Sequence, residues 1–243
     1  MKRAVIIGAT SGIGQEVAQR LLSEGWKIGI AGRRQSALSA FQNQAPKQIE
    51  IQELDVTQEE SGEKLLTLIH RLGGMDLFLL SSGIGFQNPE LMMDTELNTT
   101  QTNVVGFTRM VDTAFNYFKN KGGGHLAVIS SIAGTKGIGI APAYSATKRY
   151  QNTYIDALEQ LAHLQKLKIH FTDIRPGFVA TALLNDGKNY PLLMKVDKVG
   201  CHIMHALHRR QRVVIIDKRY RILVFFWKMI PQWMWKRLPI KTS

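Results

Sequence analysis

The strongest structural signal in the chain is a glycine-rich turn, Ile7-Gly8-Ala9-Thr10-Ser11-Gly12-Ile13-Gly14. A run of strand length, residues 2–7, precedes it, and a helical pattern over residues 13–23 follows it. A helix N-terminus presents free N–H groups and a partial positive charge, and glycines let the backbone approach phosphate oxygens closely. The turn therefore predicts a pyrophosphate site, with an ordinary glycine-rich turn between a strand and a helix as the alternative.

Strand-length apolar runs alternate with helical patterns along the rest of the chain. The expected strands are residues 2–7, 27–31, 49–54, 76–80, 125–130, 168–174 and 212–216. The expected helices are residues 13–23, 35–44, 59–72, 97–120, 143–165 and 195–210. This alternation predicts an α/β protein with a Rossmann-type doubly wound parallel sheet of about seven strands in three α/β/α layers. Ligands then bind at the carboxyl ends of the strands.

The length of 243 residues and the absence of a linker predict one domain over residues 1–218, followed by a short apolar and basic extension over 219–243. The only cysteine, Cys201, cannot form an intrachain disulfide, and we expect a cytoplasmic protein. No secretory signal or run of about 20 apolar residues is visible. His202 and His208 point to different sides of the predicted helix 195–210, so we expect no metal site.

Positive charge is concentrated near the end of the chain. Residues 195–243 hold twelve basic and two acidic residues, so this segment carries 12 − 2 = +10 of the formal net charge of +12. Such asymmetry favours an acidic partner, either an anionic membrane surface or a nucleic acid. The segment contains no recognisable nucleic-acid-binding module, so a nucleic acid is the weaker hypothesis.

The second expected strand ends in Ala31-Gly32-Arg33-Arg34. Enzymes that use NAD usually place an acidic residue here to bind the ribose hydroxyls, whereas arginine matches a phosphate in charge and geometry. The sequence therefore predicts NADP(H) as the cofactor in preference to NAD(H). A solvated pair of loop arginines is the alternative.

Four polar residues are candidates for catalysis. Tyr144 and Lys148 are four residues apart and share a face of the predicted helix, where an ammonium would lower the phenol pKa. Ser131 follows a buried strand thirteen residues before Tyr144 and is expected to hydrogen-bond a substrate oxygen. Asn103 is expected to interrupt its helix and to anchor a water-linked path to Lys148. The alternatives are a surface pair for Tyr144 and Lys148, and a satisfied polar core residue for Asn103.

With these residues together, nearly the whole chain resembles the short-chain dehydrogenase/reductase family, with a Tyr-x-x-x-Lys active site. The resemblance implies that the catalytic residues are Asn103, Ser131, Tyr144 and Lys148. It implies cofactor contacts from Gly8, Thr10, Ser11, Gly12, Ile13, Gly14, Arg33, Arg34, Asp55, Val56, Ser81, Ser82, Gly83, Asn103, Tyr144, Lys148, Pro176, Gly177, Val179 and Thr181. The chain departs from the family at Ile7, where Thr is usual, and at Leu80-Ser81-Ser82-Gly83, where Asn-Asn-Ala-Gly is usual.

The resemblance implies an NADPH-dependent oxidoreductase that reduces a carbonyl group or oxidises the matching CH–OH group. Ser131 would orient the carbonyl oxygen, Tyr144 would protonate it, and Lys148 would lower the tyrosine pKa and bind the nicotinamide ribose. Asn103 would hold the water of the proton relay. The family further implies a homodimer or homotetramer built on the helices that contain Asn103 and Tyr144. A cofactor-binding regulatory or scaffold protein without turnover is the alternative.

Two apolar segments lie beyond these motifs. Residues 182–194 are expected to cover the substrate, and their apolar side chains favour an apolar substrate unless they only pack the lid down. Residues 222–237 combine tryptophan and phenylalanine with lysine and arginine, and Pro231 is expected to split them into two short helices. This composition is typical of a segment that lies on the anionic inner face of a membrane. Packing on the protein body or at a subunit interface is the alternative.

Overall fold

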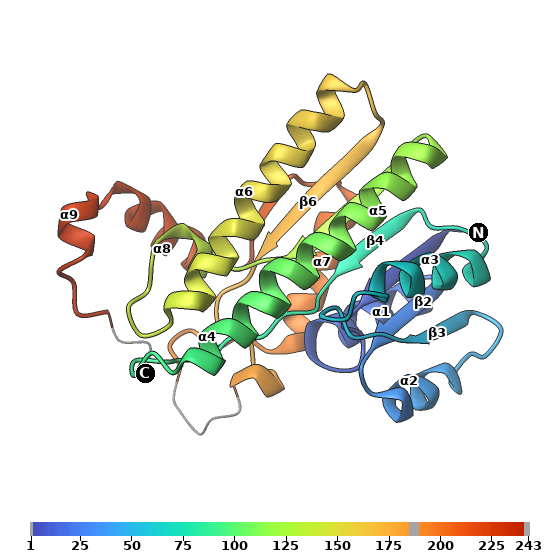
Figure 1. Cartoon of the computed structure of the whole chain (residues 1–243), viewed down its shortest axis with the longest axis horizontal. Coiled ribbons are helices and arrows are strands. Elements are labelled where there is room, and N and C mark those ends of the chain that lie inside the picture. The colour runs from blue at the N-terminus through green and yellow to red at the C-terminus, as the bar shows by residue number, and fades with distance from the viewer. Residues whose placement is uncertain (1, 185–189, 241–243) are drawn as a thin grey trace.

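The computed structural model describes residues 2–184 and 190–240, with a seven-stranded parallel sheet at the centre (Figure 1). Every neighbouring pair of strands is parallel, and the order is β3-β2-β1-β4-β5-β6-β7. The strands are β1 (Arg3–Ile7), β2 (Lys27–Gly32), β3 (Ile49–Glu53), β4 (Leu77–Leu80), β5 (Gly124–Ile129), β6 (Ile169–Arg175) and β7 (Val213–Ile215). The predicted Rossmann-type doubly wound sheet is confirmed, and each expected strand forms.

Two layers of helices enclose the sheet, as the nearly continuous burial of its central strands requires. The helices of one layer are α1 (Gly12–Ser23), α2 (Gln35–Gln42) and α7 (Val196–His208), and their apolar faces form one core with the sheet. Those of the other are α3 (Ser61–Leu72), α5 (Phe107–Lys121) and α6 (Pro142–Leu164), which form the second core. In Figure 1, α5 and α6 run next to each other across the sheet.

The strand order places a crevice between β1 and β4. The chain proceeds outward from β1 to β3 on one side and then returns to start β4 on the other side of β1. Connections that leave the two strands therefore diverge to opposite faces, which opens a crevice at the carboxyl edge of the sheet. The glycine turn after β1 and the loop after β4 both border it.

The helix expected over residues 97–120 begins earlier and is not uniform. It starts with α4 (Met93–Thr100), continues through a π-helical segment (Gln101–Gly106) and ends with α5. Asn103 lies inside the π-helical segment, where its side chain pairs with the backbone N–H and C=O of Ile84. The expected interruption of the helix at Asn103 is thus present, and a hydrogen-bonded asparagine side chain accompanies it.

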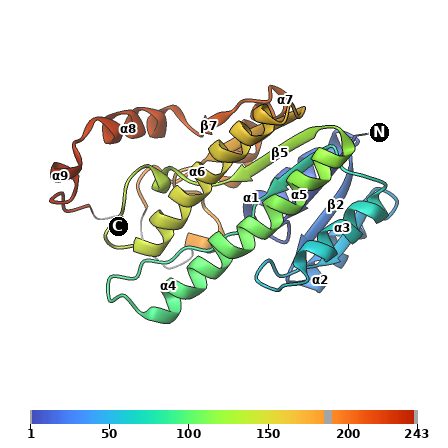
Figure 2. The same cartoon turned by 45° about the horizontal axis from the view of Figure 1, so that its top comes forward.

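The C-terminal segment forms two short helices at the end of the molecule where α6 begins (Figure 2). They are α8 (Lys218–Met229) and α9 (Gln232–Trp235), separated at Pro231 as expected. Proline cannot donate a backbone hydrogen bond within a helix, so it ends the first helix and begins the second. Within residues 2–184 and 190–240, no helix is both long and apolar enough to cross a membrane.

Candidate active site

The glycine turn leaves β1 in a conformation that only glycine adopts without strain. Gly8 has φ +88°, and a Cβ atom there would lie 2.6 Å from the backbone nitrogen of Ser82. The turn therefore packs directly on the loop that follows β4. This close approach brings the predicted cofactor residues Ser81, Ser82 and Gly83 alongside the glycine turn.

The start of α1 is available for an anion. Ser11 is the N-cap residue, but its side chain makes no capping hydrogen bond, so the first-turn N–H groups remain free to bind a ligand. Thr181, in the loop after β6, lies 3.2 Å from the position of a Cβ on Gly12. The glycine turn and the loop after β6, which contains Pro176 and Gly177 and is called the Pro-Gly loop below, therefore meet over the start of α1, which fits a dinucleotide pyrophosphate.

A cavity of about 780 Å³ adjoins this point. Its walls include Gly12 and Gln15 of α1, Thr181, and the lid residues Tyr190 and Leu193. Among the described residues, its walls come from α1 and the lid rather than from Ser131 or Tyr144. The cavity therefore belongs to the phosphate side of the crevice, between the start of α1 and the lid.

The two arginines after β2 lie beside the glycine turn and are exposed. The Arg34 guanidinium donates hydrogen bonds to the backbone oxygen of Thr10 (2.9 Å) and to its hydroxyl (3.2 Å). This contact fixes a positive charge at the edge of the turn, next to the exposed Arg33. The pair suits a phosphate group on the adenosine ribose.

The remaining predicted adenosine contacts lie after β3. Asp55 accepts hydrogen bonds from the backbone N–H and the hydroxyl of Thr57, and these bonds fix the loop. Val56 is buried against Gly106 in the π-helical segment. The loop after β3 is therefore held next to the helix that contains Asn103, at the same edge of the sheet as the glycine turn.

The predicted catalytic residues meet at this edge. Tyr144 and Lys148 belong to α6, with the Lys148 Nζ atom 5.8 Å from the centre of the Tyr144 ring. Ser131 follows β5, and its side chain lies close enough to Tyr144 to lower the pKa of the phenol. A Cβ on Gly83 would lie 3.4 Å from the Lys148 Nζ atom and 3.3 Å from Asn103 Oδ1. Asn103, Ser131, Tyr144 and Lys148 thus surround the loop that touches the glycine turn.

The Tyr144 phenol is held in its protonated form. Burial raises its pKa above the ordinary value, and the Ser131 side chain offsets part of this rise. The expected net lowering of the tyrosine pKa does not occur, because burial outweighs the contributions that lower it. The ammonium faces the ring and directs its hydrogen bonds to the backbone oxygen of Ile129 (3.2 Å) and to Gln151 Oε1 (3.0 Å). A protonated phenol beside Ser131 is suited to donating a proton.

The surroundings of Lys148 disfavour its charged form. Burial lowers the pKa of Lys148 to about 8, and the Asp173 carboxylate raises it in part. Gln151 connects the lysine to Asn103, because its Oε1 accepts from Lys148 Nζ while its Nε2 donates to the Asn103 backbone oxygen (2.9 Å). The resemblance assigns a relay water to Asn103, and here the Asn103 backbone oxygen accepts a hydrogen bond from the Gln151 amide.

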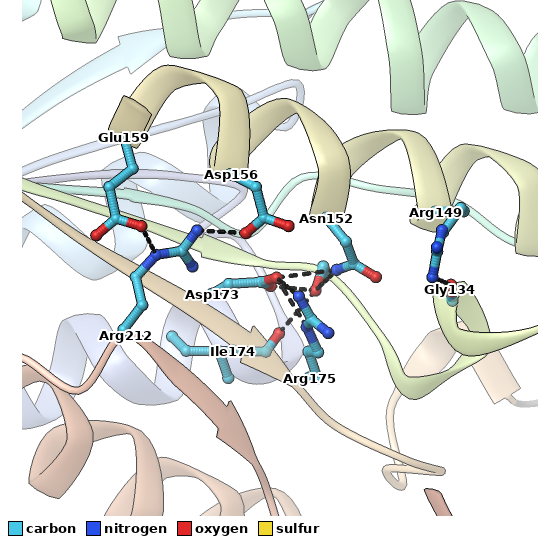
Figure 3. A network of polar contacts seen from close by, with 10 residues as sticks. Gly134, Arg149, Asn152, Asp156, Glu159, Asp173, Ile174, Arg175 and Arg212 are labelled. Carbon is cyan, nitrogen blue, oxygen red and sulfur yellow. Dashed lines mark hydrogen bonds and ion pairs between the residues drawn. The ribbon is translucent and has the colours of Figure 1, made fainter. Parts of the chain in front are cut away.

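A buried network of hydrogen bonds is centred on Asp173 (Figure 3). The Asp173 carboxylate, on β6, accepts hydrogen bonds from the Ser130 hydroxyl, from Asn152 Nδ2 (2.9 Å) and from Arg175 Nε (2.8 Å). Asp173 is fully buried, and its salt bridge to Arg175 measures 2.6 Å. The network joins β5, β6 and α6, so it fixes the strand end that carries Ser131 relative to the helix that carries Tyr144.

Sequence reasoning missed Gln151, Asn152 and Asp173 as parts of this site. Gln151 follows Lys148 by three residues and so shares its helix face, which was a visible signal. Asp173 lies between Thr172 and Ile174 in a strand expected to be buried, and a charged residue there requires a buried partner. The partner could not be read from the sequence, because Ser130 and Asp173 are neighbours only across two paired strands.

The described end of the expected lid, residues 190–194, is held by Tyr220 of α8. The Tyr220 hydroxyl donates to the backbone oxygens of Pro191 (2.9 Å) and Leu192 (3.2 Å), and it accepts from the Phe178 N–H (3.1 Å). Its ring fills the space beside Gly177, the glycine of the Pro-Gly loop. Residues 185–189 of the predicted lid lie outside the described residues. In the part of the chain that the structure describes, no group of three or more histidine, cysteine or acidic residues forms a metal site.

Comparison with known proteins agrees with this geometry. A family model described as short chain dehydrogenase matches residues 2–189. An uncharacterized oxidoreductase of Myxococcus xanthus is 30% identical over 197 residues, which cover 79% of this chain and 77% of that protein. Among solved structures, a serine dehydrogenase complexed with NADP+ has a TM-score of 0.78 at 20% identity, covering 87% of this chain and 92% of that one. A 3-ketoacyl-(acyl-carrier-protein) reductase from Brucella melitensis, complexed with NADH, has a TM-score of 0.77 at 22% identity, covering 89% and 96%. The chain is therefore an oxidoreductase of the short chain dehydrogenase family.

Proposed function

We propose that the protein is an NADPH-dependent reductase of a carbonyl compound, working in reverse on the matching alcohol, with Tyr144 as the general acid or base. The observation that carries this proposal is that Lys148 and Asn103 meet at Gly83, and Tyr144 at Gly85, in the loop after β4 that adjoins the glycine turn. A scaffold that binds the cofactor without turnover would have no need of a buried lysine beside a phenol at this point.

The residues divide the chemistry among them. NADPH supplies the hydride when it is bound, and the crevice from Gly8 to Thr181 holds it. Ser131 donates a hydrogen bond to the substrate oxygen as negative charge develops there, and Tyr144 gives that oxygen its proton. Lys148 faces the phenol and stabilises the charge that the phenol carries after proton transfer. Asn103 and Gln151 hold the lysine in place.

The simplest test follows NADPH absorbance with a panel of ketones, aldehydes and 3-oxoacyl compounds. We expect oxidation of NADPH with at least one carbonyl class and no oxidation without substrate. Tight NADPH binding without turnover on any of these classes would favour the scaffold function instead.

Reductase activity is expected to fall as the pH rises through about 8, the pKa of Lys148. A lysine with a lowered pKa is charged below that value and neutral above it, so the alkaline side lacks the charge that stabilises the Tyr144 phenolate. The measurement is kcat against pH with saturating NADPH. Activity that stays level up to 10.5, the ordinary pKa of lysine, would contradict this role.

Changing Arg33 to Asp should shift cofactor preference from NADPH toward NADH by roughly 10- to 100-fold, since a charge-assisted hydrogen bond contributes about 1.5–3 kcal/mol. The ratio of kcat/KM for the two cofactors measures this shift. Lys47→Asp is the matched control, because Lys47 is exposed before β3, at the opposite edge of the sheet. Unchanged NADPH affinity in both Arg33→Asp and Arg34→Asp would show that neither arginine binds the phosphate on the adenosine ribose.

We further propose a cytoplasmic homodimer or homotetramer that associates through α5 and α6. The apolar and basic residues that are exposed between residues 219 and 240 support a peripheral position on the inner face of a membrane. Size-exclusion chromatography with light scattering measures the oligomer, and a monomeric, active enzyme would contradict the first of these statements.

A further inference from the structure

The outer face of α8 is apolar and exposed. Ile222, Phe225, Phe226 and Met229 follow one another at helical spacing and are each between 57% and 65% exposed. Trp233, beyond Pro231, is a further exposed apolar side chain of the C-terminal segment, at 64%. Single exposed apolar residues are ordinary, but a continuous set of this size marks an interaction surface.

The charge around this face has one sign. Residues 218–240 contain six basic residues and no acidic residue. On α8, Arg221 and Lys228 lie along one edge of the exposed apolar stripe by helical spacing, and Lys218 lies at its N-terminal end; all three are exposed. Arg221 also lines a groove of about 400 Å³ with Ile222, Phe225 and Phe226.

This combination identifies the partner. A second copy of the chain, docked face to face about a two-fold axis, would bring the same basic residues together without an acidic residue from this segment. A nucleic acid would bind the basic residues, but it would leave the phenylalanines and Trp233 exposed to water. An anionic lipid bilayer accepts both parts, because its headgroups attract lysine and arginine and its acyl boundary receives the aromatic side chains.

The inner face of the same segment packs against loops that adjoin the predicted catalytic residues. Tyr220 holds the lid and the Pro-Gly loop, as described above. Trp235 is buried, and its indole N–H donates to the backbone oxygen of Gly137 (2.7 Å). Lys136 donates to the backbone oxygen of Ile230 (2.9 Å). Residues 136 and 137 belong to the loop that connects Ser131 to Tyr144, so the segment contacts both this loop and residues 191–192 of the expected lid.

We propose that residues 218–240 seat the protein on an anionic bilayer and that its substrate is an apolar carbonyl compound dissolved in that bilayer. The seating depends only on the surface, whereas the substrate class rests on the proposed function. Because the lid and the loop after Ser131 are both fixed to this segment, seating brings the substrate entrance to the lipid.

Seating is tested by sedimentation of the full-length protein with vesicles of phosphatidylcholine, with and without phosphatidylglycerol. We expect binding only to the anionic vesicles, and loss of binding at high salt. The double variant Phe225→Ser/Phe226→Ser and the double variant Arg221→Glu/Lys228→Glu should each reduce binding at least about tenfold. The matched controls are Leu66→Ser, an exposed leucine on α3, and Lys47→Glu, an exposed lysine before β3. Both controls should bind like the parent.

Equal binding to both vesicle types, or none, would overturn the seating. A change of oligomer size in Phe225→Ser/Phe226→Ser, without vesicle binding by the parent, would assign the surface to a second copy of the chain. The substrate class is tested with a short soluble ketone and a long-chain ketone carried in the vesicles. We expect the two double variants to lose activity only on the vesicle-borne ketone. Equal activity of parent and variants on both ketones would overturn the substrate class, whereas inactivity on every carbonyl would count against the proposed function and leave the sedimentation result standing.

Discussion

Tyr144→Phe is expected to lower kcat for carbonyl reduction by roughly 10²- to 10⁴-fold, the usual contribution of a general acid. The substitution removes only the hydroxyl that lies beside Ser131, so the ring still packs against the loop after β4. NADPH binding, measured by fluorescence titration, should change little. Steady-state kinetics with the best carbonyl substrate measures the loss.

Tyr117→Phe is the matched control for this substitution. The Tyr117 hydroxyl accepts a hydrogen bond from the Met75 N–H (3.0 Å) at the opposite edge of the sheet. Its removal should leave kcat unaltered. If Tyr144→Phe keeps the activity of the parent, the tyrosine is not the proton donor. If both variants lose activity together, the loss reflects the fold and not the chemistry.

Asp173→Ala is expected to lower the free energy of unfolding by about 3–5 kcal/mol, as is usual when one member of a buried ion pair is removed. The substitution leaves the Arg175 guanidinium, the Asn152 amide and the Ser130 hydroxyl without their shared acceptor. Urea denaturation followed by tryptophan fluorescence measures the change. Asp156→Ala is the matched control, because Asp156 also pairs with an arginine, Arg212, but its side chain is 63% exposed. That pair should contribute no more than about 1 kcal/mol.

The isosteric variant Asp173→Asn separates this structural effect from an electrostatic one. Asp173 raises the pKa of Lys148, so removal of its charge should lower that pKa below about 8. The alkaline fall in kcat is then expected to begin at a lower pH than in the parent. A purely structural role would reduce stability without moving the pH profile, and an unmoved profile would contradict the electrostatic coupling.

Local sequence patterns determined the overall arrangement, because each of them depends on neighbours along the chain. Continuous apolar runs predicted the seven parallel strands, and the turn from Gly8 to Gly14 predicted the ligand edge. The spacing of Tyr144 and Lys148 placed both on one helix face, and Pro231 divided the C-terminal helices. In each case the signal lies within a few residues, where helix and strand periodicity operate.

Only the tertiary structure decided the electrostatics and the contacts of these residues. The pKa of Tyr144 depends on burial by segments distant in the chain, and this burial raises it although Lys148 lies one helical turn away. The partner of Asp173 and the bridge through Gln151 depend on strand pairing and on the packing of α6. The sequence likewise does not distinguish the buried face of α8 from the exposed one, since Val224 and Phe225 are both apolar. Packing buries the first and exposes the second, because only the fold determines which side of the helix meets the core.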